Sequence, residues 1–345
     1  MPDIKHILVF RLSAMGDVAM TVPVIRALVA QYPTIKVTVV SRPFFSPFFE
    51  GILNVDFFPI DLKERHKGFL GLYRLYRELK MSHIDAIADL HNVLRSKVIR
   101  SFFALGGKKV AFVDKGRAEK KALTRVENKI FKPLTPMVIR YTRVFDQLGF
   151  PVDLQQPIFP LPQPLAAAVQ AITGEKSGKW IGIAPFAQYA SKVYPQELMQ
   201  QVIRQLAGNP GYKIFLFGGG AQEIAVLEQF AAGLTNVKVI AGILKLKQEL
   251  QLISHLDVML SMDSGNAHIA AMLGIKVITI WGATHPYAGF IPFNQPMDSA
   301  IVADRERYPL LPTSIYGNKQ VEGYEAVMES ISPSEVVEKI VAVLG

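Results

Sequence analysis

The residues best suited to chemistry in the first part of the chain lie in one short turn, Ser13 to Asp17, with the sequence Ser-Ala-Met-Gly-Asp. This turn follows a strand-like apolar run, His6–Phe10, and precedes a segment with helical apolar spacing, Val18–Gln31. A glycine in such a turn lets the backbone approach a ligand closely, and the start of a helix favours negative charge. Asp17 has two possible roles: it caps the helix, or it acts as a general base on a bound hydroxyl. The local pattern alone favours the cap.

A second strand-to-helix turn of the same kind occurs late in the chain. Asp263, Ser264 and Gly265 directly follow the strand-like run Val258–Ser261. Backbone N–H groups and the positive end of a helix dipole meet at such a junction, and together they favour a bound diphosphate. His268 lies one turn into the helix, where it either contacts a ligand or is simply packed.

Two further positions could belong to a nucleotide site. Lys192 stands at a loop-to-helix junction, where it could neutralise a phosphate, although a surface lysine is the plainer interpretation. Glu223 follows a run of three glycines, Gly218–Gly220, and is a candidate partner for ribose hydroxyls. These motifs are not the dinucleotide-binding fingerprint, because the first turn has one glycine where that fingerprint has three.

The elements that would position these residues alternate between strand-like and helix-like segments, which predicts βαβ units and parallel sheets. Helical spacing in the first half covers 68–81 and 93–105. The strand-like runs are His6–Phe10, Val37–Ser41, Asp56–Ile60, Asp85–Leu90, Lys109–Val113, Trp180–Ala184, Lys213–Phe217, Val237–Ala241, Val258–Ser261 and Lys276–Ile280.

Five prolines between Pro151 and Pro164 interrupt this alternation and predict an interdomain linker. We therefore predict an α/β protein with two facing, Rossmann-like, doubly wound domains and a ligand-binding cleft between their strand ends. The predicted boundaries are 1–150, a linker at 151–165, 166–330, and a closing helix at 331–345 that Ser332 caps.

Composition narrows the class of protein. The 345 residues include no cysteine, which excludes disulfides and thiolate metal sites and favours a reducing compartment. We find neither a signal peptide nor an apolar run of about 18 residues, so the sequence predicts a cytoplasmic protein without a membrane span. Residues 1–150 hold 25 Lys/Arg against 13 Asp/Glu, a net charge of +12, whereas residues 151–345 hold 13 against 16, a net charge of −3.

The basic half predicts an anionic partner. Nine Lys/Arg residues lie between 101 and 132, and a smaller cluster comprises Lys63, Arg65, His66 and Lys67. These residues could recognise a phosphorylated, acidic glycolipid and hold the protein at the inner-membrane surface, with apolar positions such as Phe103, Phe112 and Phe131 in an interfacial helix. The alternative is a mobile, solvated loop.

Taken together, the motifs resemble those of the ADP-heptose:lipopolysaccharide heptosyltransferases, glycosyltransferase family 9, which have the GT-B fold. The family's Ser-x-Met/Ile-Gly-Asp turn is matched by Ser13 to Asp17, and its Asp-Thr/Ser-Gly-x-x-His segment by Asp263 to Ala271. Its Lys-x-Trp-Pro segment is matched by Lys192 to Pro195, and the run from Asp89 to Ser96 looks like its segment ending Leu-x-Arg/Lys-Ser. The resemblance covers essentially the whole chain in order and spacing.

The resemblance implies a role for each matched residue. Asp17 would be the general base that deprotonates the acceptor hydroxyl, and Lys192 would stabilise the leaving diphosphate. The donor nucleotide sugar would be held by Asp263, Ser264, Gly265, His268 and Glu223. The reaction would invert the anomeric centre without a metal or other cofactor, because a lysine and helix N-termini can carry the leaving-group charge. The predicted acceptor-binding residues are Ser13, Met15, Gly16, Lys63, Arg65, Lys67, Arg95, Arg125 and Arg140.

Two departures from the family pattern stand out. Tyr194 occupies the position where the family usually has tryptophan, and Pro136 replaces the histidine of a His-x-Val-x-Arg-Tyr pattern that ends here at Arg140-Tyr141. The sequence also leaves three other functions open: transfer of another sugar or to another glycan, a GT-B-fold sugar-nucleotide epimerase, and a nucleic-acid-binding protein. The last lacks any recognised nucleic-acid module, so we predict no nucleic-acid partner.

Overall fold

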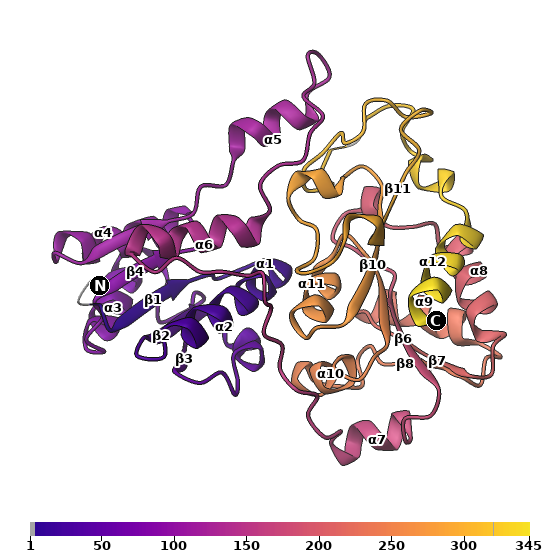
Figure 1. Ribbon diagram of the computed structural model, residues 1–345, viewed down its shortest axis with the longest axis horizontal. Coiled ribbons are helices and arrows are strands. Elements are labelled where there is room, and N and C mark those ends of the chain that lie inside the picture. The colour runs from indigo at the N-terminus through magenta and orange to yellow at the C-terminus, as the bar shows by residue number, and fades with distance from the viewer. Residues whose placement is uncertain (1–3, 320) are drawn as a thin grey trace. The chain divides into compact units, whose positions relative to one another are not determined.

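The computed structural model describes residues 4–319 and 321–345, and these form two compact units (Figure 1). Unit 1 comprises the chain up to Gly116 together with Thr135–Ile158. Unit 2 comprises Arg117–Leu134 and Phe159–Gly345. The chain therefore passes between the units three times.

Unit 1 is built on a five-stranded parallel sheet with the order β3-β2-β1-β4-β5. Its central strands are apolar and rich in valine and isoleucine because both faces of the sheet are covered. The strands are β1 (His6–Phe10), β2 (Lys36–Ser41), β3 (Val55–Pro59), β4 (Ala86–Asp89) and β5 (Lys109–Phe112). The chain order reverses between β1 and β4, and parallel sheets bind ligands beside the strand ends at such a point.

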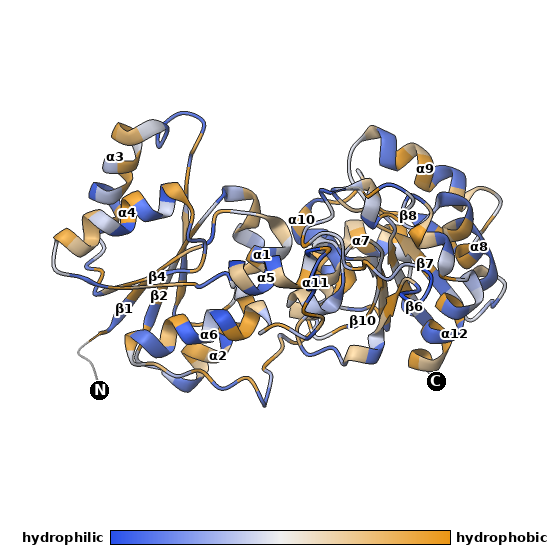
Figure 2. Ribbon diagram, turned by 90° about the horizontal axis from the view of Figure 1, so that it is seen from above, coloured by the Kyte–Doolittle hydropathy of each residue, from blue (hydrophilic) through white to orange (hydrophobic). Residues whose placement is uncertain are grey.

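Helices cover both faces of this sheet. Figure 2 shows α3 (Gly68–Lys80) and α4 (Leu94–Leu105) on one side, with α2 (Thr21–Gln31) and α6 (Met137–Leu148) on the other. The short helix α1 (Met15–Ala19) links the end of β1 to α2. Leucines on the inner face of α3 and the apolar face of α4 complete a core with the side chains of β1 and β4.

Unit 2 has a six-stranded parallel sheet with the order β11-β10-β9-β6-β7-β8, which reverses between β6 and β9. Its strands are β6 (Lys179–Ala184), β7 (Tyr212–Leu216), β8 (Val237–Val239), β9 (Val258–Met262), β10 (Lys276–Trp281) and β11 (Ala300–Val302). Its helices are α5 (Arg117–Thr124), α7 (Ala167–Thr173), α8 (Gln196–Ala207), α9 (Ala221–Ala231), α10 (Leu246–Ile253), α11 (Gly265–Met272) and α12 (Pro333–Leu344). Both units are therefore doubly wound, as the alternation of segments predicted.

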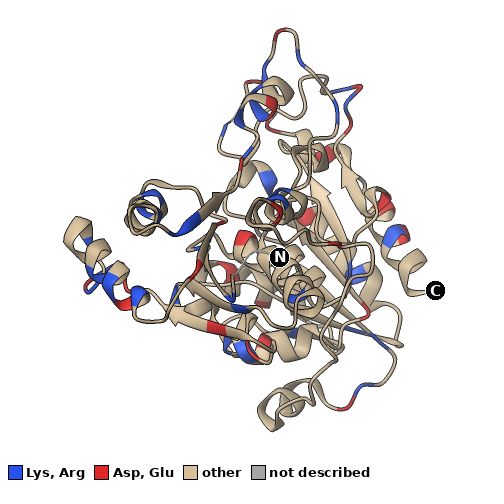
Figure 3. Cartoon of the chain, turned by 60° about the vertical axis from the view of Figure 1, so that its left-hand side comes forward, with Lys and Arg blue, Asp and Glu red and all other residues tan. Residues whose placement is uncertain are grey.

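Residues 117–134, which we call the arm, leave unit 1 and pack within unit 2. The arm contains α5, and Figure 3 shows Lys and Arg positions in blue along it. Leu123, Leu134 and Phe131 form a small apolar cluster with residues of the segment 287–315. The backbone N–H of Leu134 donates to the Tyr287 carbonyl at 2.9 Å, and Lys129 Nζ donates to the Pro312 carbonyl at 2.9 Å.

The structure contradicts the predicted interfacial helix with Phe103, Phe112 and Phe131 on one face. Phe131 stacks on Arg305, whose guanidinium carbon lies 3.4 Å from the centre of the phenylalanine ring. Phe103 is buried in the core of unit 1. Only Phe112 of the three named positions is exposed, and it lies on β5. The three phenylalanines therefore do not share a helix face that could enter a membrane, and that prediction was wrong.

The predicted elements agree with the structure to within a few residues, and Ser332 caps α12 as predicted, since its Oγ accepts the Glu335 N–H at 3.1 Å. The proline-rich segment is divided between the units. Its first residues are fastened to the end of α2, where Tyr32 and Gln31 donate to the carbonyls of Pro151 and Asp153, and Phe159 packs on Phe293 in unit 2. The sequence did not predict α6, α7 or β11.

Candidate active site

The turn after β1 holds a carboxylate and a buried guanidinium in direct contact. Asp17 is the third residue of α1, and its Oδ2 lies 2.5 Å from Nη2 of Arg11. Arg11 is 5% exposed and its Nη1 donates to the Leu90 carbonyl at 2.8 Å, which anchors it to the end of β4. The Asp17 side chain is 26% exposed. The carboxylate is thus held on one side and open to solvent on the other.

Asp17 does not occupy the N-cap position of α1. That position belongs to Ala14, and Asp17, at the third position of the helix, accepts the Ala14 backbone N–H in a long hydrogen bond of 3.4 Å. The main partner of the carboxylate is therefore Arg11, which the sequence analysis did not identify. The sequence does place Arg11 directly after the strand-like run His6–Phe10, and that position could have marked it as a site residue.

Arg11 remains a cation despite its burial. Burial alone would lower its pKa, but Tyr141 and the Asp17 carboxylate outweigh that effect and raise the pKa above its ordinary value. The Tyr141 ring centre lies 5.9 Å from the guanidinium carbon. A permanent positive charge therefore fixes the orientation of Asp17.

His91 lies beside this pair at the end of β4 and is neutral. Burial, together with the charges of Arg11 and Lys115, lowers its pKa to about 3. Its Nδ1 faces the Leu12 N–H at 3.4 Å. The preceding turn is held by the buried Asp89, which accepts the backbone N–H groups of His91 and Asn92 and pairs with Arg100 at 2.8 Å.

The other predicted acceptor residues of unit 1 are dispersed. Ser13 and Met15 are half-buried beside Asp17, and Gly16 is buried under the turn. Lys63, Arg65 and Lys67 lie together on the exposed loop before α3, and Arg95 is exposed in the first turn of α4. Arg125 lies in the arm, in unit 2, where its Nε donates to the Asn128 carbonyl at 2.6 Å.

Arg140 is enclosed in unit 1. It is 3% exposed and donates to the carbonyls of Thr135 and Asp114 at the two ends of the excursion that forms the arm. A Cβ atom at Gly116 would lie 2.4 Å from the guanidinium, so the chain passes directly over it. Arg140 therefore fastens the backbone where the arm begins and ends, and its guanidinium is not exposed at the surface, where an acceptor would bind.

In unit 2 two predicted donor residues, Lys192 and Asp263, meet beyond the ends of β6 and β9. Lys192 Nζ lies 2.9 Å from Oδ2 of Asp263, and Thr284 Oγ donates to the same oxygen at 2.9 Å. Both members of the ion pair are largely buried. Gly317 packs against the lysine stem, since a Cβ there would lie 2.4 Å from Lys192 Cδ. The ammonium group is therefore held in one place.

The N-terminus of α11 follows directly. Ser264 is the N-cap residue, yet its side chain does not bond the helix and instead contacts Ser261 Oγ at 3.0 Å. The backbone N–H groups of the first turn, which begins at Gly265, are therefore not capped by that side chain and can face an anion. His268 is buried one turn further along.

Glu223 shapes the glycine-rich loop. It lies in the first turn of α9, and its Oε2 accepts the Gly219 N–H at 2.7 Å. A Cβ at Gly218 would lie 3.1 Å from the same oxygen. The carboxylate thus orders the loop in which a ribose partner was predicted.

A family model described as "Glycosyltransferase family 9 (heptosyltransferase)" matches residues 72–310, more than half of the chain. The chain belongs to glycosyltransferase family 9. The resemblance predicted from the motifs and the prediction of a glycosyltransferase enzyme are both confirmed.

This family 9 chain is also similar to individual lipopolysaccharide heptosyltransferases. Lipopolysaccharide core heptosyltransferase OpsX of Haemophilus influenzae is 29% identical, with 82% of this chain and 80% of the relative covered. Lipopolysaccharide heptosyltransferase 2 of Salmonella typhimurium is 26% identical, with 98% of each chain covered.

Solved structures show the same fold. A glycosyl transferase family 9 protein from Veillonella parvula superimposes with a TM-score of 0.77 at 20% identity, covering 100% of this chain and 98% of the other. The E. coli heptosyltransferase WaaC with ADP gives 0.69 at 19% identity, covering 98% and 99%. The predicted GT-B fold class is therefore confirmed.

The two departures from the family 9 pattern have structural explanations. Tyr194 is buried in the core of unit 2, and its hydroxyl donates to the Ile331 carbonyl at 2.7 Å. Burial, with a smaller contribution from Glu335, raises its pKa to about 12, so it stays a neutral donor. Pro136 is the N-cap residue of α6, where its missing N–H costs nothing. Tyr194 is thus a core residue.

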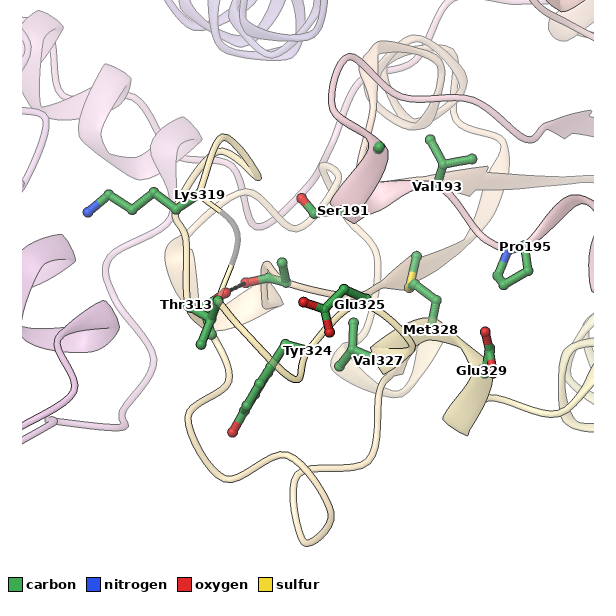
Figure 4. Close-up of a pocket in the computed structure, with 13 residues that line it drawn as sticks. Ser191, Val193, Pro195, Thr313, Lys319, Tyr324, Glu325, Val327, Met328 and Glu329 are labelled. Carbon is green, nitrogen blue, oxygen red and sulfur yellow. Dashed lines mark hydrogen bonds between the residues drawn. The ribbon is translucent and has the colours of Figure 1, made fainter.

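A cavity of about 170 Å³ lies in unit 2 behind the loop that carries Lys192 (Figure 4). Ser191 and Val193, the neighbours of that lysine, line it together with Ala283 and the segment 324–329. Ser191 Oγ also donates to the Gly317 carbonyl at 2.6 Å. This cavity therefore borders the backbone that positions the lysine and does not include its ammonium group.

The described part of the chain, residues 4–319 and 321–345, contains no group of three or more His, Cys, Asp or Glu side chains that could hold a metal ion. In the same residues, no helix is long and apolar enough to cross a membrane.

Proposed function

We propose that this chain transfers a heptose from ADP-heptose to an acceptor in the lipopolysaccharide inner core, with inversion at the anomeric carbon. The names of its relatives and its membership of family 9 support heptose as the sugar and lipopolysaccharide as the acceptor. The solved structure of the E. coli heptosyltransferase WaaC with ADP supports ADP as the nucleotide of the donor. The observation that carries the mechanism is the Arg11–Asp17 pair, because it gives a partly exposed carboxylate a fixed orientation at the ligand-binding edge of a parallel sheet.

In the proposed step, the acceptor hydroxyl oxygen forms a bond to the anomeric carbon of the donor. Its proton passes to the Asp17 carboxylate. The bond between that carbon and the diphosphate oxygen breaks, and ADP leaves with the bonding electron pair. Attack opposite the leaving group inverts the centre.

The residues of unit 2 would stabilise the leaving diphosphate. Lys192 supplies a fixed positive charge, and the first turn of α11 supplies backbone N–H groups. Asp263 holds the lysine in place, and Glu223 and His268 would contact the nucleoside and the sugar. Because these groups carry the charge, we propose that the reaction needs no metal. Undiminished transfer in the presence of EDTA would support this, whereas activity that EDTA abolishes and Mg²⁺ restores would contradict it.

The acceptor would be an anionic glycolipid bound by unit 1, beside Asp17 and through the exposed cations Lys63, Lys67 and Arg95. We also propose a cytoplasmic location, where a lipid-linked acceptor would bring the protein into peripheral contact with the inner membrane. Outside the arm, residues 1–116 and 135–150 hold 19 Lys/Arg against 11 Asp/Glu, and this excess in unit 1 supports the assignment.

The test combines one variant with two measurements. Asp17→Asn preserves the shape of the side chain, and we expect ADP binding by calorimetry within about twofold of the wild type. Transfer should fall by about 10²–10⁴-fold, the usual contribution of a general base. Transfer within tenfold of the wild type would make Asp17 a structural residue. A thermal-shift comparison of ADP-heptose with UDP- and GDP-sugars identifies the donor, and stabilisation by a UDP- or GDP-sugar alone would replace ADP-heptose in the proposal.

A further inference from the structure

Helix α3 presents apolar side chains to solvent on one side while it packs on unit 1 with the other. Phe69, Leu70 and Tyr73 are 64%, 80% and 45% exposed, whereas Leu72 and Leu75 are buried in the core. The helix therefore has two apolar faces, of which only the inner one is explained by folding. Figure 2 shows α3 and α4 on the same face of the sheet of unit 1.

The exposed rings do not move freely. The Phe69 and Tyr73 ring centres lie 5.7 and 5.5 Å from the Phe102 ring centre on α4, in edge-to-face contacts. An aromatic side chain supported in this way loses little further freedom on binding. The outer face of α3 is thus a preformed apolar surface.

Positive charge surrounds this face. Residues 63–80 contain six Lys/Arg and two Glu. Lys63, Lys67, Arg74 and Arg77 are exposed, while Glu78 is paired with Arg65 at 2.8 Å and contacts His66 at 3.3 Å. The excess charge is therefore cationic and available at the surface.

The basic loop is fixed to the helix. The Asp61 carboxylate accepts the backbone N–H groups of residues 63, 64 and 65, and these bonds lower its pKa. Gly71 packs directly on the His66 backbone, where a Cβ atom would lie 2.4 Å away. Cations and apolar side chains therefore belong to one ordered surface, the α3 surface, defined by Lys63, Lys67, Phe69, Leu70, Tyr73, Arg74 and Arg77.

We propose that the α3 surface is where this enzyme docks on an anionic lipid bilayer, with Phe69 and Leu70 inserted at the interface and the cations on lipid phosphates. Aromatic and leucine side chains flanked by Lys and Arg are the combination that interfacial helices use. A stable protein partner would need to bury roughly 1,200 Å² or more, and three projecting side chains supply a small part of that. The proposal rests on the proposed function only in expecting a membrane-borne acceptor.

The experiment is flotation of the full chain with vesicles of phosphatidylcholine, with and without 30% phosphatidylglycerol. The test variant is Phe69→Ser/Leu70→Ser. The matched control is Leu53→Ser, also 80% exposed in unit 1 but close in sequence to Glu50 and Asp56. We expect the wild type and the control to bind the anionic vesicles alike, and the double variant at least tenfold more weakly.

A second variant, Arg74→Gln/Arg77→Gln, tests the charge, and we expect weaker binding to anionic vesicles with unchanged melting temperature. Failure of the wild type to bind anionic vesicles, or unchanged binding of Phe69→Ser/Leu70→Ser, would overturn the proposal. Transfer to a soluble, delipidated acceptor separates the two proposals. It should be unchanged in Phe69→Ser/Leu70→Ser, and its absence in the wild type would refute the proposed function while leaving the vesicle result standing.

Discussion

Replacing Arg11 by methionine tests how the carboxylate of Asp17 is held. Methionine fills a similar volume but removes the ion pair to Asp17 and the hydrogen bond to the Leu90 carbonyl. The lost hydrogen bonds are worth about 1–3 kcal/mol in this setting. The full cost of about 3–5 kcal/mol for breaking a buried pair is not expected, because Asp17 is 26% exposed and water can solvate it.

We therefore expect unit 1 of Arg11→Met to unfold about 5–10 °C below the wild type in calorimetry, since about 2–3 kcal/mol shifts a domain of this size by that amount. Transfer should fall about 100-fold because the base is no longer oriented. ADP binding should be unchanged, because the predicted donor residues belong to unit 2. Arg11→Lys keeps the charge but cannot contact Asp17 and the Leu90 carbonyl at once, so its transfer rate should lie between those of the wild type and Arg11→Met.

The kinetic result decides the interpretation. A variant that loses stability but transfers sugar at the wild-type rate would show that the pair serves folding alone. A variant that is as stable as the wild type would show that water replaces the guanidinium at no cost.

Three further changes probe other parts of the structure. Gly317→Ala should displace Lys192 and weaken ADP binding at least tenfold in calorimetry. The control is Gly323→Ala, because Gly323 has a similar positive φ but nothing within 4 Å of an added Cβ, so this variant should lose stability alone. Equal effects of the two variants on ADP binding would contradict the prediction. The pKa of His91 is about 3 in the folded protein and 6.5 in the unfolded chain, so below pH 6.5 the unfolded chain binds a proton that the folded protein does not. The folded protein should therefore lose about 2 kcal/mol of stability at pH 5. Urea unfolding of His91→Gln should show a smaller loss of stability towards acid pH, and the same dependence on pH in the variant and the wild type would refute this. Phe131→Ala should loosen the arm and make it the first site of tryptic cleavage, and an unchanged cleavage pattern would show that other contacts hold it.

The strands of both sheets could be predicted because parallel strands covered on two faces must be apolar along their whole length. The same alternation placed Asp17 and Asp263 in strand-to-helix junctions. The structure has Asp17 in the first turn of α1, the helix that follows β1, and Asp263 directly after β9. These are local patterns, and each is contained within about 15 residues of sequence.

Contacts between distant segments could not be predicted in this way. Nothing near Asp17 in sequence indicates that Arg11 is anchored by Leu90, 79 residues away. The phenylalanines and cations of 101–132 suggested a membrane helix, yet Phe131 packs under Arg305 in unit 2. An apolar residue in a basic segment fits a lipid surface or a protein core equally well, and only the fold distinguishes them.

The arm has a consequence for exchanging parts between relatives. Because the chain crosses from one unit to the other after Gly116, after Leu134 and after Ile158, no single cut separates two complete folding units. A chimera joined at the proline-rich segment would inherit its arm from one parent and the Tyr287–Phe290 surface beneath it from the other. A chimera designed to exchange donor specificity should therefore take both segments of unit 2, residues 117–134 and 159–345, from the same parent.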